Sequence, residues 1–137
     1  MSTFKLKVVT PDREIYNDEV RQIIVRTSSG DVGILSGHSD YIAPLATGAL
    51  KVFLPENKQR IAAISNGMIR VTKECTTILT NTCEWSDEID IERAKAAEQR
   101  ARKYLESPTK YHSEEIARLK LNRALNRINL GNIGQDK

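Results

Sequence analysis

The first part of the chain is made of short segments in which apolar and polar residues alternate. Phe4–Val8 and Val20–Thr27 show this period of two, with β-branched residues at many of the apolar positions. Alternation of this kind is typical of strands that bury one face. Further segments of the same character are Glu14–Asp18, Leu50–Leu54, Gln59–Ile64, Met68–Thr72 and Thr76–Thr82. Turn residues separate the segments, so the pattern predicts an N-terminal β-sandwich (flattened barrel) over residues 1–85.

After residue 85 the apolar residues recur at helical spacing. The first stripe consists of small residues and then two larger ones, at Ala94, Ala97, Ala101, Tyr104 and Leu105. The second stripe consists of Ala117, Leu121, Ala124 and Ile128. Stripes at i, i+3 and i+4 indicate amphipathic helices that pack along one side. The sequence therefore predicts β + α architecture, in which a C-terminal two-helix antiparallel hairpin occupies residues 86–137.

Capping and breaking residues predict where the two helices begin and end. Ser86 or Asp87 can cap the first helix, and the Ser107–Thr109 segment ends it because Pro108 disfavours helical geometry at the residue before it. We expect the second helix to begin near Ser113 and to end at Gly131.

The alanine-rich seam predicts a hairpin of marginal stability. At roughly 25 cal/mol per Å² of buried apolar surface, a few alanines contribute only a few kcal/mol. Ordering the backbone opposes this contribution by roughly 1–2 kcal/mol per residue. A marginal element is easily shifted by a ligand or partner, so the hairpin is the expected place for a conformational switch.

Glycines are concentrated in residues 29–38, between two predicted strands. Three glycines in eight positions favour an exposed loop with tight turns, and we expect Gly33 to need a positive φ. No Gly-Lys-Ser/Thr sequence follows, so this is not a phosphate-binding loop. His38 has no nucleophile or carboxylate constellation around it, and we assign it no chemistry. An exposed glycine-rich tip on a rigid sheet is a candidate docking surface.

Charge and composition exclude several classes of protein. The 137-residue chain carries a net charge of +3, and all of this excess lies in residues 88–137. So small an excess, with aromatic residues at 5%, disfavours a nucleic-acid-binding module. No nucleophile–base pair or metal-ligand set is recognisable, which disfavours an enzyme. Apolar runs are too short for a membrane span, and Cys75 and Cys83 are expected to be reduced thiols.

Charged residues at helical spacing form a candidate ligand site. Asp90, Arg93 and Arg100 fall on one face of the first helix, and Arg123 and Arg127 fall on one face of the second. If the faces meet in the hairpin, the guanidinium groups suit a phosphorylated ligand, because arginine donates in a planar fork to phosphate oxygens. The alternative is a solvated face with a few surface ion pairs, and spacing by itself favours that alternative.

Four motifs, taken in their order and spacing, resemble the epsilon subunit of bacterial F-type ATP synthases. They are Lys-Val-Val-Thr-Pro-Asp at 7–12, Gly-Ile-Leu-Ser-Gly-His at 33–38, Ile-Asp-Ile-Glu-Arg-Ala at 89–94 and Arg-Ala-Leu-Asn-Arg at 123–127. The third is similar to the ATP-recognition pattern of that family, Ile/Leu-Asp-x-x-Arg-Ala. The resemblance covers essentially the whole chain.

The resemblance implies a regulatory subunit of the central stalk that is not itself an enzyme. The β domain would bind the gamma subunit and the c subunits of the rotor ring, on the cytoplasmic face of the bacterial cell membrane. The helices would either fold as a hairpin or extend toward the alpha and beta subunits and block ATP hydrolysis. ATP would stabilise the folded hairpin as a regulatory ligand, with no catalytic cofactor and no metal site.

The resemblance also implies which residues make contacts. The ATP-binding residues would be Glu84, Ile89, Asp90, Arg93, Ala94, Arg100, Arg123 and Arg127. The rotor-ring contacts would be Asp31, Val32, Gly33 and His38. The chain has neither a phosphate-loop lysine nor an evident Mg²⁺-binding pair, so the nucleotide would be a ligand and not a substrate. Asp90 would accept a hydrogen bond from adenine or ribose, or orient Arg93.

Overall fold

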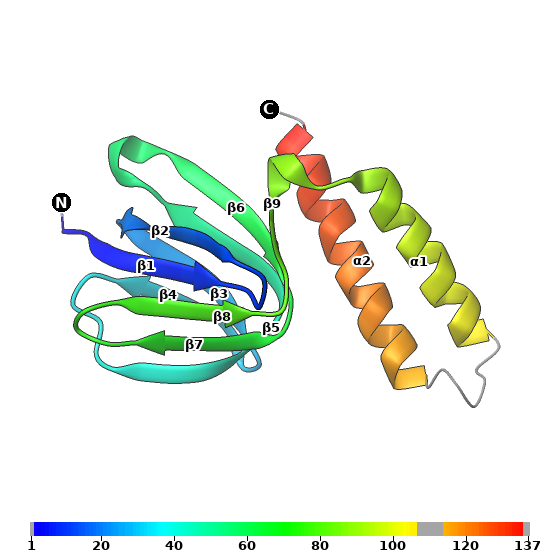
Figure 1. The fold of residues 1–137 in the computed structure, drawn as a ribbon, viewed down its shortest axis with the longest axis horizontal. Helices are drawn as coiled ribbons and strands as arrows, with labels where there is room; N and C mark the ends of the chain where they lie inside the picture. The colour runs from blue at the N-terminus through cyan, green and yellow to red at the C-terminus, as the bar shows by residue number, and fades with distance from the viewer. Residues whose placement is uncertain (1, 107–113, 136–137) are drawn as a thin grey trace. The chain divides into compact units, whose positions relative to one another are not determined.

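The computed structural model describes residues 2–106 and 114–135. The chain divides into two compact units, Met1–Trp85 and Ser86–Lys137, which we name the β unit and the helical unit. The β unit is a β-sandwich that also contains the short 3₁₀ turn η1 (Pro55–Asn57), and the helical unit is an antiparallel helix pair (Figure 1). The predicted fold class is therefore confirmed.

The described part of the β unit forms a nine-stranded sheet with the order β2-β1-β8-β7-β5-β3-β4, while β6 pairs with β5 and β9. Most pairs are antiparallel, but β1 and β8 run parallel. The strands are β1 (Phe4–Val9), β2 (Glu14–Val20), β3 (Gln22–Thr27), β4 (Gly30–Leu35), β5 (Tyr41–Phe53), β6 (Gln59–Ile64), β7 (Gly67–Val71), β8 (Thr76–Thr80) and β9 (Cys83–Trp85).

The long strand β5 divides the sheet into two layers. Its first part, Tyr41–Leu45, pairs with β7, and its last part, Gly48–Phe53, pairs with β6. The strand predicted at Leu50–Leu54 begins earlier, because Pro44 and Gly48, residue types that usually interrupt strands, both lie within β5 at this transition. Gly48 is suited to the position, since a Cβ there would lie 2.8 Å from the Cβ of Arg26.

Alternate strand residues form the core between the layers. Leu6 and Val8 of β1, like Ile23 and Val25 of β3, are completely buried, while their neighbours in sequence are more exposed. Full burial of such a side chain contributes roughly 1.5–3 kcal/mol. The core consists of Leu6, Val8, Val20, Ile23, Val25, Ile34, Leu45, Leu50, Val52, Ala62, Ile64, Ile69, Val71, Ile78, Cys83 and Trp85. All of these residues belong to the β unit.

The glycine-rich stretch is a strand and not a loop. Residues Gly30–Leu35 form β4, which pairs with β3 in continuous register from Gly30 opposite Thr27 to Leu35 opposite Gln22. The predicted positive φ at Gly33 was wrong, because Gly33 lies opposite Ile24 in this ladder. Gly30 and Gly37 are the glycines of this stretch with positive φ, at 121° and 83°. Both lie at turns, one at each end of β4.

The end of the β unit also differs from prediction. The strand expected over Thr76–Thr82 ends at Thr80, and the separate strand β9 follows, pairing with β6. Trp85, the last residue of β9, packs edge-on against Tyr16 and lies under the guanidinium of Arg60, 3.8 Å from the ring centroid. Cys75 and Cys83 are free thiols.

The helical unit contains a short 3₁₀ turn, η2 (Ser86–Glu88), and two helices, α1 (Ile91–Glu106) and α2 (Glu114–Gln135). The helices run antiparallel and side by side (Figure 1). The prediction that Gly131 ends the second helix was wrong, because α2 continues to Gln135. The predicted terminator Ser107–Thr109 and the predicted start at Ser113 lie outside the described residues. Neither α1 nor α2, over its described length, is long and apolar enough to span a membrane.

Candidate functional site

Asp90 is the residue that caps α1, in place of the predicted Ser86 or Asp87. Its Oδ1 accepts a hydrogen bond from the backbone N–H of Arg93 at 3.1 Å, and its carbonyl accepts one from the N–H of Ala94 at 3.1 Å. This is the geometry of an N-cap, in which the side chain satisfies an N–H that has no partner within the helix. The carboxylate of Asp90 remains exposed to solvent.

On α1, two arginines lie beside the buried alanine seam, at the same angle of rotation about the helix axis. Ala94 and Ala101 are the buried residues of the helix, with exposed fractions of 4% and 1%. Arg93 and Arg100 each precede one of these alanines by a single residue, so each is rotated about 100° from the seam in the same direction. Both arginines are exposed.

On α2, the two candidate arginines also flank the seam. Ala117 and Ala124 are buried, with exposed fractions of 2% and 1%. Arg123 precedes Ala124 by one residue and Arg127 follows it by three, so both are rotated to the same side of the seam. Both side chains are half-buried, and Nε of Arg123 is shielded from solvent.

The antiparallel arrangement places these two flanks on the same side of the hairpin. In an antiparallel helix pair, each helix can be viewed from its own N-terminus. Residues that are rotated from the seam in the same direction on the two helices then lie on the same side of the pair. Gly131 lies beside Ile91, and this register puts Arg127 close to the level of Arg93 and Arg123 close to the level of Arg100 along the hairpin axis. The four arginines and Asp90 therefore share one flank, which we name the arginine flank.

The opposite flank carries arginines that pair with carboxylates on their own helix. Arg102 donates to Glu98 at 2.9 Å, and Arg118 donates to Glu114 at 2.7 Å, each across one helical turn. These residues follow Ala101 and Ala117 by one position, so they are rotated away from the arginine flank. They provide matched control positions, one on each helix.

The other predicted ATP-binding residues have structural positions of their own. Ile89 and Ala94 are buried in the helical unit, with exposed fractions of 3% and 4%. Glu84 belongs to the β unit, where it is half-buried in β9 opposite Ala63 of β6. The structure thus brings Ile89, Asp90, Ala94 and the four arginines together in one unit, and holds Glu84 in the other.

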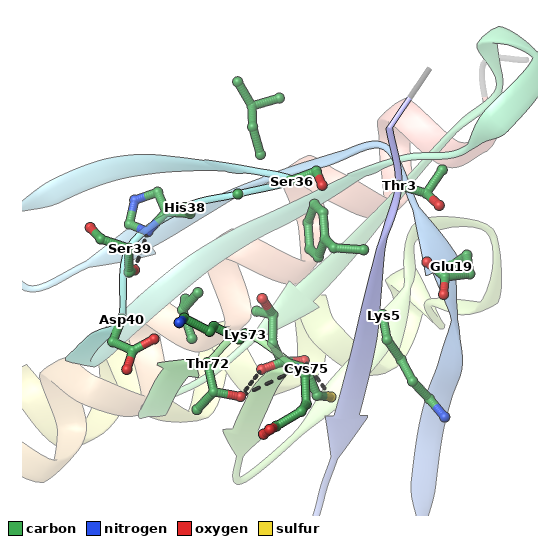
Figure 2. A pocket seen from close by; sticks show the side chains of 16 residues that line it. Thr3, Lys5, Glu19, Ser36, His38, Ser39, Asp40, Thr72, Lys73 and Cys75 are labelled. Atoms are coloured by element: carbon green, nitrogen blue, oxygen red, sulfur yellow. Dashed lines mark hydrogen bonds between the residues drawn. The ribbon is translucent and has the colours of Figure 1, made fainter.

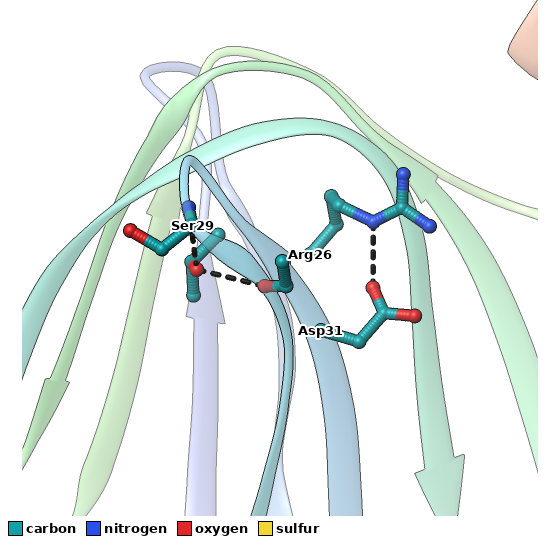
Figure 3. Close-up of polar contacts among 5 residues, drawn as sticks. Arg26, Ser29 and Asp31 are labelled. Atoms are coloured by element: carbon teal, nitrogen blue, oxygen red, sulfur yellow. Dashed lines mark hydrogen bonds and ion pairs between the residues drawn. The ribbon is translucent and has the colours of Figure 1, made fainter.

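The predicted rotor-ring residues belong to β4 and the turn after it. Asp31 is near the start of β4 and accepts a hydrogen bond of 2.6 Å from Nε of Arg26 on β3 (Figure 3). The turn between these strands is held by Thr27, whose hydroxyl donates to the carbonyl of Gly30 and accepts from the N–H of Ser29. Val32 is half-buried and Gly33 exposed. His38 follows β4, so Asp31 and His38 lie toward opposite ends of the strand.

The Arg26–Asp31 pair predicts a small, pH-dependent contribution to stability. The hydrogen bond from Arg26 lowers the pKa of Asp31 below its ordinary value, so the folded state binds this proton more weakly than the unfolded state. The contribution is therefore present above about pH 4 and is lost as the pH falls through the lowered pKa. Because the pair is exposed, Asp31→Asn should lower the free energy of unfolding by less than about 1 kcal/mol at neutral pH. In urea unfolding the difference should shrink as the pH is lowered below about 4, and an equal difference at neutral and acidic pH would contradict this assignment.

His38 lines a pocket of about 660 Å³ at one end of the sandwich (Figure 2). Its Nδ1 lies 2.7 Å from the carbonyl oxygen of Ser39, and its ring packs edge-on against Tyr41. The pocket wall mixes cationic and anionic side chains, namely Lys5, Glu19, Asp40, Lys73 and Glu74. Mixed charge of this kind does not select an anionic or a cationic ligand.

A row of apolar residues crosses four strands on the outside of the sandwich; three of them are exposed and Val9 is half-buried. Pro44 of β5 lies opposite Met68 of β7, Met68 lies opposite Leu79 of β8, and Leu79 lies opposite Val9 of β1. Met68 and Leu79 are 44% and 52% exposed. The row borders a shallow hollow of about 310 Å³. We name these four residues the apolar row; contiguous exposed apolar surface is typical of sites for protein partners.

Comparison with known proteins accounts for both units. Residues 3–86 match the family described as ATP synthase, Delta/Epsilon chain, beta-sandwich domain, and residues 87–131 match the corresponding long alpha-helix domain. The ATP synthase epsilon chain of Ruminococcus albus is 40% identical over 133 residues, which cover 96% of this chain and 98% of the relative. The chain belongs to the ATP synthase epsilon-chain family.

Other members of the epsilon-chain family and two solved structures agree with this assignment. The ATP synthase epsilon chain of Bacillus pumilus is 40% identical, over 95% of this chain and 98% of the relative. A chain in the mitochondrial ATP synthase of Euglena gracilis (OSCP/F1/c-ring) aligns with a TM-score of 0.77 and 29% identity, covering 91% of this chain and 80% of that one. A chain in the central stalk/c-ring structure of the Tetrahymena thermophila mitochondrial ATP synthase, at 14% identity and a TM-score of 0.61, shares the fold.

Some features of this epsilon chain were not found from the sequence. The apolar row needs the register of four strands that are distant in sequence, and no single segment signals it. The capping role of Asp90 had a signal, because aspartate is a preferred N-cap residue and Asp90 directly precedes the helical apolar spacing that begins at Ile91. Ser86 and Asp87 are equally good capping residues by type, which is why composition alone did not select Asp90.

Proposed function

We propose that the chain is a non-catalytic, regulatory subunit of the central stalk in a bacterial F-type ATP synthase. The β unit binds the gamma subunit and the c subunits of the rotor ring, on the cytoplasmic face of the cell membrane. The helical unit controls ATP hydrolysis. Support comes from the family match over both units, from full-length relatives that are ATP synthase epsilon chains, and from the likeness to a chain of a c-ring-containing assembly.

The arginine flank is the observation that carries the regulatory part of the proposal. Arginine at Arg93, Arg100, Arg123 and Arg127 gives one side of the hairpin a set of planar donors that match phosphate oxygens. Asp90 lies at the edge of this flank. A carboxylate can accept several hydrogen bonds, so the bond from the N–H of Arg93 leaves capacity for a donor on adenine or ribose. The ligand that fits this combination is ATP, held by both helices at once.

A ligand that bridges α1 and α2 stabilises the closed hairpin and opposes its opening. The seam beneath the arginine flank contains four buried alanines, Ala94, Ala101, Ala117 and Ala124, and the larger side chains of Ile89 and Leu130 are buried in the same unit. Alanines bury little area, so the seam contributes only a few kcal/mol. Without ATP the helices separate and extend toward the alpha and beta subunits, where they inhibit hydrolysis. Calorimetry of the isolated chain with ATP tests this proposal: we expect saturable binding at a single site, and no binding at millimolar ATP would exclude ATP regulation while leaving the stalk role intact.

The apolar row is the proposed docking surface for the gamma subunit. It is largely exposed, continuous across β5, β7, β8 and β1, and formed by a part of the sandwich whose core is complete without it. Burial of apolar surface is the main favourable term in protein association. The rotor-ring contact is proposed for β4 and the following turn, at Asp31, Val32, Gly33 and His38.

Charge introduced into the apolar row should prevent docking without unfolding the protein. We expect Leu79→Lys to weaken binding to the gamma subunit by about 30-fold or more, as replacement of a central apolar anchor costs about 2 kcal/mol or more. The melting temperature should change little, because Leu79 is 52% exposed. The matched control is Leu35→Lys on β4, where an equally exposed leucine lies outside the row. Binding assays with purified gamma subunit decide the question, and equal loss in both variants would show that the row is not the docking surface.

A further inference from the structure

Gly131 occupies a position in α2 that its helix propensity does not explain. The residue is buried and lies inside the helix, with four more helical residues before the end at Gln135. Glycine is among the poorest helix formers, so the presence of glycine at this position must be due to a neighbouring group. A Cβ at this position would lie 2.9 Å from Cγ1 of Ile91 and 3.1 Å from Cγ2 of Ile89. The missing side chain of Gly131 therefore makes room for two isoleucines at the beginning of the first helix.

Those two isoleucines enclose the cap of α1. Asp90 lies between them in the sequence. Its carboxylate accepts a hydrogen bond from the backbone N–H of Arg93, and its carbonyl accepts one from the backbone N–H of Ala94. Ile89 is only 3% exposed. Isoleucine is β-branched and has few rotamers available, so neither side chain can easily move away from an added methyl group. The position of the Asp90 cap thus depends on close contact with α2.

We infer that Gly131, Ile89 and Ile91 form a latch that makes the order of the first turn of α1 depend on closure of the hairpin. In this arrangement Ile89 is a positioning residue, which acts through Asp90 and Arg93 and does not itself contact a nucleotide. Separation of α2 from α1 removes the support of Ile89 and loosens the segment that carries Asp90 and Arg93. For ATP, the inference rests on the proposed function. A ligand that binds only when the first turn of α1 is ordered will, by thermodynamic linkage, also favour the closed latch.

Gly131→Ala tests the latch in the full-length chain without nucleotide. Hydrogen exchange of the Arg93 and Ala94 amides reports the opening of the first turn of α1. By helix propensity alone, alanine would stabilise α2 and slow these amides by up to about fivefold. Because the added methyl displaces Ile89 and Ile91, we expect exchange to become about tenfold faster instead. The measurement contains no ATP, so failure of the latch is distinguishable from failure of ATP binding.

Two further variants keep the test decisive. Asn132→Ala, at the exposed neighbouring position, changes helix propensity without entering the contact and should slow exchange or leave it unchanged. Ile91→Ala removes the atom nearest to the added methyl, so Gly131→Ala should not speed exchange further in that background. If Gly131→Ala unfolds the helices outright, Ile91→Ala in combination should restore the helical circular-dichroism signal. Slower exchange in Gly131→Ala, or no relief by Ile91→Ala, would overturn the latch.

Discussion

Replacement of both Arg93 and Arg127 by alanine is expected to abolish measurable ATP binding by the isolated chain. Each arginine offers charge-assisted hydrogen bonds, and loss of such a bond costs about 1.5–3 kcal/mol. Each single variant should therefore bind ATP about 10- to 100-fold more weakly, and the double variant should fall below detection by calorimetry. The two residues lie on different helices of the arginine flank, so their joint effect also tests whether one ligand contacts both helices. Arg102→Ala and Arg118→Ala, on the opposite flank, should retain parental affinity.

The same double variant separates binding from regulation in the assembled enzyme. A ligand that binds only the closed hairpin stabilises it by about 2.7 kcal/mol at a hundredfold excess over Kd. This is comparable to the few kcal/mol of the alanine seam, so loss of the ligand should shift the hairpin toward the extended form that we propose to be inhibitory. ATP hydrolysis at high ATP should then be more strongly inhibited than with the parental chain. Parental ATP affinity in the double variant would refute the site, and lost binding with unchanged inhibition would refute the switch.

Gly67→Ala should strongly destabilise the β unit. A Cβ at this position would overlap the carbonyl oxygen of Leu79 and lie 2.8 Å from Cα of Thr80, which are backbone atoms of the neighbouring strand. Since β8 is paired on both sides, it cannot withdraw without breaking ladder hydrogen bonds. We expect a loss of about 3 kcal/mol or more, at the upper end for an overpacked site. For a domain of this size the melting temperature should fall by roughly 10–20 °C.

A second glycine on a strand is the control for this prediction. In Gly33→Ala the nearest atom to the new Cβ would be Nε2 of Gln22 at 3.5 Å, an ordinary contact with the end of a flexible side chain. Gly33 has no positive φ, so alanine meets no backbone strain. Its thermal unfolding should stay close to that of the parent, and a fall as large as that of Gly67→Ala would show that the contact with Leu79 is not the cause.

The sequence predicted most elements because period-two and helical spacing are local properties. It did not distinguish what individual glycines do. Gly30 provides a positive φ at a turn, whereas Gly67 and Gly131 permit a close approach by a neighbour that lies far away in sequence. Both uses look the same in a sequence, which is why the sequence predicts a helix end at Gly131 and a positive φ at Gly33, and the structure has neither. Similarly, a proline such as Pro44 usually indicates that a strand is interrupted. Here the strand continues through Pro44, because β5 pairs first with β7 and then with β6.

The candidate site was predictable as two separate halves. The spacing of Arg93 with Arg100, and of Arg123 with Arg127, fixed one face on each helix. Whether those faces lie on the same side depends on the rotation of each helix about its buried alanines and on the register between helices. Neither property is contained in the spacing of charged residues, which is why spacing alone favoured a solvated surface. The structure supplied the buried positions from which the common flank follows.

Trp85 gives the chain a built-in optical probe for one of its two units. It is the single tryptophan of the sequence, and it is buried in β9, in contact with Tyr16 and Arg60 of the same unit. Its emission spectrum will report solvent entry into the sandwich. Ellipticity at 222 nm is instead dominated by α1 and α2, which belong to the helical unit. Denaturant titrations that record both signals on one sample can therefore resolve opening of the hairpin from loss of the sandwich without any added label.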